Sequence, residues 1–166
     1  MDTIEVTTTV ERPPAVVFSF LRDFTNYANY SKHLRQVAVD GDGGVGTRYR
    51  IRFGWWRLTY DAYTRVTGVE EPSVVEWEVS RDIDAHGRWV VEPLDDGEAS
   101  RVRFVVSYDP ASVSAGMLDV PRLVSLDWVV SKAVGLIEAE GRRVVERVVA
   151  DLEGEPRSVD LTVEYR

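Results

Sequence analysis

Residues 126–152 read LDWVVSKAVGLIEAEGRRVVERVVADL, and they decide the fold because their apolar positions recur every three or four residues. The stripe consists of Leu126, Val130, Val134, Ile137, Gly141, Val144, Val148 and Leu152. Charged residues such as Lys132 and Glu138 fall between these positions, which predicts one amphipathic helix of about 28 residues, roughly 42 Å long. Such a stripe needs an apolar partner surface, so the helix is expected to cover a sheet.

The sequence before this helix supplies that sheet. From Arg35 to Val106 apolar and polar residues alternate, which is the period of strands with one buried face. Six antiparallel strands are expected, centred on residues 37–39, 48–53, 56–62, 75–79, 89–92 and 102–106. Together with the first strand described next, they predict a curved antiparallel sheet of about seven strands with one apolar face.

The N-terminal stretch predicts a strand followed by two short helices. Residues 3–10 alternate in the same way, and Pro13 and Pro14 then suit the entrance of a helix that ends near Asp23. Tyr27 and Tyr30 are three residues apart, so a second brief helical turn is expected to carry both on one face.

The last residues predict one more strand. Residues 158–165 alternate Val, Leu, Val and Tyr with polar residues, after the short break Gly154-Glu155-Pro156. No repeat or interdomain linker interrupts the chain, so we expect a single domain over residues 1–166, with a core over 2–153 and the tail strand over 158–165.

Composition excludes several classes of function. The 166-residue chain carries a formal net charge of −8, which argues against a nucleic-acid partner. It has no cysteine, so disulfides and thiolate sites are excluded, and neither a signal peptide nor a membrane-spanning run is found, which predicts a cytoplasmic protein without stable membrane insertion. Only two lysines stand against eighteen arginines, which suits either a high-salt cytoplasm, as in a halophile, or an arginine-rich codon bias with a solvated acidic surface.

The order of these elements resembles the START-related or SRPBCC superfamily, in particular its polyketide cyclase and lipid-transport branch. The opening EVTTTVERPPAVVFSFLRDFTNY (5–27) is similar to the start of that family, GVGTRYRIRF (44–53) to its third strand, and GRWVVEPLDDGEASRVRFVVSYDP (87–110) to its last hairpin. The resemblance covers residues 2–153 and implies an α+β helix-grip fold, in which a bent sheet grips the C-terminal helix around a cavity for an apolar ligand. The tail over 157–166 departs from the family pattern.

The aromatic residues of the sheet raise the question of what fills this space. Strand parity directs most of them toward the helix, where they either interlock as a core or line a pocket for a flat or polycyclic ligand. A shift of parity at a bulge would exchange Trp55 for Trp56, or Tyr63 for Tyr60. We favour the pocket, whose expected ligand-binding residues are Tyr30, Tyr49, Phe53, Trp56, Tyr60, Trp77, Trp89, Phe104 and Val134.

No motif identifies a catalytic or cofactor site. Residues 41–46 match GxGxxG, but a strand and not a helix is predicted to follow, so a hairpin turn is expected. His33 and His86 lie on separate elements without metal-ligand spacing. His86 is expected at the rim of a strand, where it is either an exposed surface residue or an acid–base group at the mouth of the pocket. Arg48, Arg50 and Arg52 form an outer-face row, expected to pair with Glu76 and Glu78 across the sheet, although such a row also suits an anionic partner.

Three functions remain open at this stage, and none requires a metal or a cofactor. The first is carriage or sensing of a small hydrophobic ligand (lipid, quinone or polyketide-like) without covalent chemistry. The second is a polyketide cyclase or dehydratase, which would work mainly by folding a reactive chain in a shaped cavity. The third is an interaction subunit that adds the C-terminal strand to another chain, including a homodimer.

Overall fold

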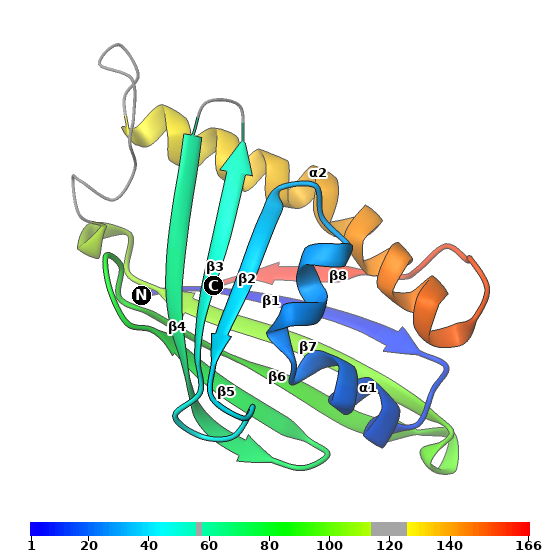
Figure 1. Ribbon diagram of the computed structural model, residues 1–166. Coiled ribbons are helices and arrows are strands. Elements are labelled where there is room, and N and C mark those ends of the chain that lie inside the picture. The colour runs from blue at the N-terminus through cyan, green and yellow to red at the C-terminus, as the bar shows by residue number, and fades with distance from the viewer. Residues whose placement is uncertain (56–57, 114–125) are drawn as a thin grey trace.

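The computed structural model describes residues 1–55, 58–113 and 126–166, and for residues 55, 58 and 126–138 it describes the backbone only. The described strands form one antiparallel sheet in the order β2-β3-β4-β5-β6-β7-β1-β8 (Figure 1). Their bounds are β1 (Asp2–Val10), β2 (Leu34–Asp40), β3 (Arg48–Trp55), β4 (Leu58–Glu70), β5 (Val74–Val79), β6 (Ala85–Leu94), β7 (Ala99–Tyr108) and β8 (Thr162–Tyr165). The seven-stranded sheet and the added C-terminal strand are thus confirmed.

The helices follow the predicted order. Pro14 opens α1 (Pro14–Leu21), and Asp23 caps η1 (Phe24–Asn29), a 3-10 helix, by accepting a hydrogen bond from the Thr25 backbone N–H at 3.1 Å. Two short 3-10 turns, η2 (Asp95–Gly97) and η3 (Pro110–Ser112), flank β7. The long helix α2 (Leu126–Glu153) has 28 residues, as the apolar stripe predicts.

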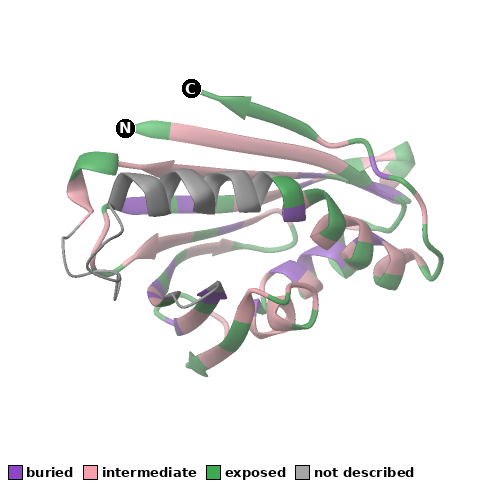
Figure 2. Ribbon diagram, turned by 90° about the horizontal axis from the view of Figure 1, so that it is seen from above, coloured by how far each residue is buried: buried purple, intermediate pink, exposed green. Residues whose placement is uncertain are grey.

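The sheet curves around α2, as the helix-grip fold requires. Figure 2 shows α2 inside this curve, with β1 and β8, at the chain ends marked N and C, running along one side. Pairing in register carries one apolar row across the concave face, because Val6 lies opposite Phe104, Phe104 opposite Trp89, and Trp89 opposite Val75. This row is the surface that faces α2.

The closed part of the core lies where α1 and η1 cover the same concave face. Phe18 and Phe24 are buried there against strand residues such as Val91 and Val102. Val149 from the last turns of α2 completes the cluster. Burial of these apolar side chains supplies the main driving force for folding and fixes how α1, η1 and α2 sit on the sheet.

The glycine-rich segment 41–46 is a hairpin turn between β2 and β3, so its rejection as a dinucleotide motif is confirmed. Gly41 has φ +131°, and a Cβ there would stand 2.9 Å from the Thr47 Cα. The Thr47 hydroxyl in turn accepts a hydrogen bond from the Gly43 N–H at 2.9 Å. The turn needs glycine for sterics and not for a phosphate.

Two predictions about the surface and the tail need correction. The tail strand begins at Thr162 and not at residue 158, because Val159 turns into the core, where it is 3% exposed and its carbonyl accepts from Arg142 at 2.8 Å. The arginine row is not neutralised by Glu76 and Glu78, since Glu76 lies opposite Arg88. The Glu78 carboxylate, in turn, pairs with Arg65 at 2.5 Å.

Candidate ligand-binding site

The concave face carries a run of aromatic rings in contact with one another. Phe104 on β7 lies 4.5 Å from Trp89 on β6 and 6.1 Å from Trp77 on β5, measured between ring centroids. The Trp77 indole lies over Gly87, where an added Cβ would stand 2.4 Å from the indole Cζ2 atom, so the missing side chain makes room for the ring. All three rings were expected to face the helix. The strand pairing puts them on the concave face, because Trp89 lies opposite Phe104 and Trp77 lies two residues after Val75, the partner of Trp89.

One end of this aromatic run is filled. Tyr49 is 2% exposed and stacks on Phe24 at 4.6 Å, and Phe24 stacks on Tyr27 at 5.2 Å. The Tyr49 hydroxyl donates to the Arg22 carbonyl at 3.4 Å. Burial is the largest cause that raises the pKa of Tyr49 and also that of Tyr27, so both hydroxyls stay protonated. Tyr49 therefore belongs to the packed core, because η1 brings Phe24 against it.

The other end, which we call the open end, is not covered by the described residues. Phe53 on β3 remains 39% exposed and stacks on Tyr60 of β4 at 6.4 Å, with which it is paired in register. Tyr63 lies on the convex face, where the Arg81 guanidinium stands 3.8 Å from its ring centroid, so the parity of β4 is as predicted. Trp56 lies outside the described residues, and so does the side chain of Val134.

Tyr30 is held by polar contacts at its hydroxyl and at its carbonyl. Its hydroxyl donates to Asp151 of α2 at 2.7 Å, and its carbonyl accepts from Arg147 at 2.8 Å. Burial and the hydrogen bond to Asp151 raise the pKa of Tyr30 to about 12. These contacts fasten the end of η1 to the last turns of α2.

Four buried polar atoms have no hydrogen-bond partner in the part of the chain that the structure describes: His33 Nε2, Tyr60 Oη, Thr64 Oγ1 and Trp77 Nε1. Three of them belong to the concave face of neighbouring strands, and His33 lies beside Gly54, whose carbonyl is 3.3 Å from its Nδ1. Buried polar groups are nearly always paired in folded proteins. Several unpaired ones on one apolar face, among aromatic rings, are typical of a site that binds a molecule with polar atoms.

The chemistry of this cluster is mainly that of hydrogen-bond donors. An indole N–H can only donate. Burial, followed by the charges of Asp82 and Asp61, raises the pKa of Tyr60 to about 12, so its hydroxyl keeps its proton at neutral pH. Thr64 can donate or accept. The concave face thus offers donors among flat apolar walls.

His33 and Thr64 were not predicted as site residues. The alternation of the strand could have predicted Thr64, since it lies four residues after Tyr60 and shares its face. His33 was not, because its position depends on the contact of the η1–β2 connection with Gly54, which strand parity does not encode. Here the backbone N–H of Gly54 donates to the His33 carbonyl at 2.8 Å.

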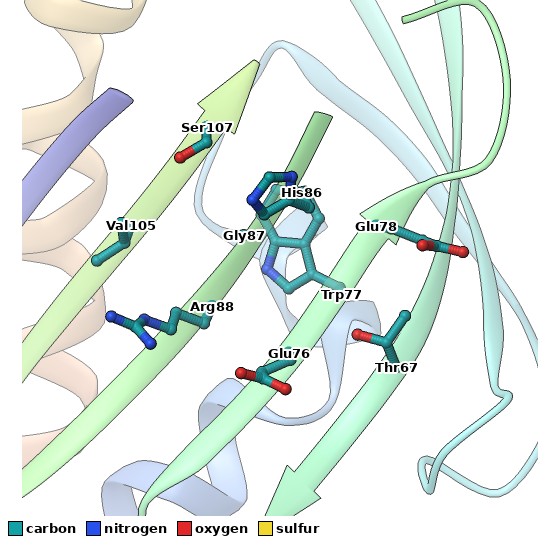
Figure 3. Close-up of a pocket in the computed structure, with 9 residues that line it drawn as sticks. All are labelled: Thr67, Glu76, Trp77, Glu78, His86, Gly87, Arg88, Val105 and Ser107. Atoms are coloured by element: carbon teal, nitrogen blue, oxygen red, sulfur yellow. The ribbon is translucent and has the colours of Figure 1, made fainter. Parts of the chain in front are cut away.

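His86 lies on the convex face, and not at the mouth of this site. It is exposed and faces a groove of about 520 Å³ across β5, β6 and β7. Figure 3 shows the groove, with Glu76 and Glu78 from β5, Arg88 from β6 and Ser107 from β7 around it. Trp77 and Val105 also line the groove, so its surface is mixed polar and apolar.

The described residues provide no metal site and no membrane helix. Within residues 1–55, 58–113 and 126–166, no three histidine, aspartate or glutamate side chains gather closely enough to hold an ion. Asp61 pairs with Arg52 at 2.8 Å and Glu92 pairs with Arg103 at 3.2 Å, so both carboxylates are engaged in ion pairs on the outer face of the sheet. None of the described helices has a stretch long and apolar enough to cross a bilayer.

Comparison with known proteins identifies the family. The sequence profile described as polyketide cyclase / dehydrase and lipid transport matches residues 1–153. A search of curated proteins gives no significant match.

Among solved structures, the Zhui aromatase/cyclase from Streptomyces sp. R1128 is similar with a TM-score of 0.66 at 16% identity, covering 92% of this chain and 94% of that one. A conserved protein from Geobacillus kaustophilus gives a TM-score of 0.63 at 12% identity, covering 96% and 98%. Norcoclaurine synthase from Thalictrum flavum gives 0.53 at 12% identity, covering 65% and 69%. At these identities the likeness establishes the fold alone.

Proposed function

Because the chain belongs to the polyketide cyclase / dehydrase and lipid transport family, we propose that it binds a small, flat, mainly apolar molecule between the concave face of the sheet and α2. The ligand would lie on Trp77, Trp89 and Phe104 and reach the open end at Phe53 and Tyr60. The activity proposed is carriage or sensing, without covalent chemistry.

The unpaired polar atoms of Tyr60, Thr64 and Trp77 are the observation that carries this proposal. Each of them has already lost its hydration on folding, so a ligand atom that pairs with it restores a hydrogen bond at little further cost. Since the Trp77 N–H only donates and the Tyr60 hydroxyl stays protonated, the matching ligand group is an acceptor such as a carbonyl oxygen. A quinone or an aromatic ketone combines this group with a flat apolar body.

The expected affinity follows from the surface that such a molecule would bury. Enclosing about 300 Å² of apolar surface at about 25 cal/mol per Å² gives a gross gain of roughly 7.5 kcal/mol. Ordering costs reduce this gain, and paired hydrogen bonds restore part of it. Dissociation constants in the micromolar range are therefore expected.

The proposal is tested with two probes that differ only in their carbonyls, menadione and 2-methylnaphthalene. Menadione is a thiol-reactive quinone, but the chain has no cysteine, so only reversible binding is measured. Quenching of tryptophan fluorescence should give an affinity about tenfold higher for menadione, because one or two hydrogen bonds add about 1 kcal/mol each. Tyr60→Phe should remove most of that difference, whereas Tyr63→Phe on the convex face serves as the matched control and should retain it.

Two results would contradict the proposal. One is the absence of saturable binding for both probes, together with a purified protein whose native mass spectrum carries no retained small molecule. The other is an equal loss of affinity in Tyr60→Phe and Tyr63→Phe, because the two hydroxyls lie on opposite faces of β4.

A cyclase activity is the second candidate, and the buried Nε2 of His33 favours it. An imidazole can take and return a proton near neutral pH, as intramolecular aldol condensation of a polyketone chain with loss of water requires. His33→Ala should then abolish formation of the cyclised product while His86→Ala should not. Binding of the substrate with no product in the wild-type protein would leave carriage as the function.

A further inference from the structure

The convex face carries a basic groove that the concave site does not use. It crosses the outer side of β2, β3, β4 and β5 and measures about 860 Å³. Four arginines line it: Arg48, Arg50, Arg65 and Arg81. We call this surface the arginine groove.

The sheet register brings these four side chains together. Arg48 and Arg65 are directly opposite each other on β3 and β4, and Arg50 lies opposite Tyr63. Side chains opposite one another in an antiparallel pair stand about 5 Å apart at Cβ. The Arg81 guanidinium lies 3.8 Å from the Tyr63 ring centroid, so the ring holds it beside the other three.

The arginines outnumber the carboxylates of the groove, which are Asp40 and Glu78 among the described residues. Glu78 pairs with Arg65 at 2.5 Å, and Asp61 pairs with Arg52 next to the groove at 2.8 Å. The described residues form no ion pair with Arg48, Arg50 or Arg81, although Asp40 lies opposite Arg48 in register. Like charges placed opposite each other destabilise a sheet, and Glu78 offsets the charge of Arg65 in the Arg48–Arg65 pairing, so Arg48, Arg50 and Arg81 are the side chains left to receive an anion.

From this placement we propose that the arginine groove docks an acidic segment of another protein. The chain has a net charge of −8, so most of its surface repels anions. A local concentration of arginines on such a protein attracts a negatively charged partner to that one place. Arg48, Arg65 and Arg81 are exposed in an open groove, which is typical of a protein interface and not of an enclosing small-molecule pocket. Arginine also suits carboxylates, which it binds through two N–H groups at once.

A fluorescein-labelled decaglutamate peptide tests the proposal. Its anisotropy should rise on titration with the full chain at low salt, even though the net charge of the protein repels it. The triple substitution Arg48→Gln, Arg50→Gln and Arg81→Gln should weaken binding about tenfold or more, because each exposed ion pair contributes a few-fold in affinity. Amide shifts on peptide addition should map to β3 and β4 around residues 48–50 and 63–65.

A matched control separates this groove from general charge. Arg101→Gln removes one exposed arginine from the convex side of β7, outside the groove, and should leave peptide affinity unchanged. Three outcomes would overturn the proposal: no peptide binding by the wild-type chain, equal binding by the triple variant, or binding only to vesicles that contain phosphatidylserine. Since the variants keep the concave face intact, menadione binding should be unaffected in all of them, so the proposed function is tested separately.

Discussion

The unpaired hydroxyl of Tyr60 leads to an unusual prediction, that its removal makes the free protein more stable. Tyr60→Phe deletes a buried oxygen that has no hydrogen-bond partner among the described residues and keeps the ring stacked on Phe53. A buried polar group without a partner carries a desolvation penalty of about 1–3 kcal/mol. We expect the substitution to raise the free energy of unfolding by about 1 kcal/mol, the lower end of that range.

Tyr30→Phe is the matched comparison, because it deletes the same atom from the same residue type. The Tyr30 hydroxyl donates to Asp151 at 2.7 Å and joins η1 to α2. Its loss should lower the free energy of unfolding by about 1–2 kcal/mol, since a hydrogen bond to a charged group is among the stronger ones. The two substitutions thus have the same chemistry and opposite signs.

Urea unfolding followed by far-ultraviolet circular dichroism measures both effects in ligand-free protein. Linear extrapolation with unchanged slopes would show that the substitutions alter stability and not the unfolded state. If Tyr60→Phe lowers the free energy of unfolding as much as Tyr30→Phe does, the Tyr60 hydroxyl has a partner within the protein, and its assignment to a ligand is refuted.

Two further predictions concern the edge of the sheet near β1. The hydrogen bond and charge of Arg103, aided by the charge of Arg166 and opposed by burial, lower the pKa of Glu5 below its usual 4.5. The carboxylate therefore stabilises the fold fully above pH 4.5 and stops doing so as the pH falls through the lowered folded-state pKa. Glu5→Gln should cost about 1 kcal/mol at pH 7 and almost nothing in acid, measured by chemical unfolding, and an equal cost at both pH values would contradict this account. Deleting residues 162–166 removes β8 and exposes the β1 edge, so the sedimentation coefficient should increase with protein concentration more than it does for the full chain. Identical sedimentation of the two proteins would show that β8 does not protect that edge.

The sequence predicts those parts of this structure that depend on local periodicity. The parity of β4 separates Tyr60 from Tyr63 because successive side chains of a strand point to opposite faces, whatever packs on them. The 28 residues of α2 follow from an apolar stripe of helical period.

Local periodicity does not predict contacts between segments that are distant in the sequence. Tyr49 has the parity of a wall residue, yet it lies in the filled core because Phe24 of η1 stacks on it. Tyr30 is aromatic, yet its hydroxyl is bound by Asp151, 121 residues later. Val159 fits a strand pattern but turns inward, and Arg48 lies opposite Arg65 through a register that composition alone does not give.

The two ends of the aromatic run show why a site should form where it does. At the closed end, the rings of Phe24, Tyr27 and Tyr49 stack on one another. The hydroxyl of Tyr27 donates to the Leu21 carbonyl and that of Tyr49 to the Arg22 carbonyl. At the open end, Tyr60 and Trp77 have no such carbonyls among the described residues. A molecule that accepts hydrogen bonds from them binds only the folded chain, so at 100 times its dissociation constant it should add about 2.7 kcal/mol to stability. Tyr60→Phe should make this increment smaller while raising the stability of the free protein, because the same unpaired oxygen that costs stability is the one the ligand uses.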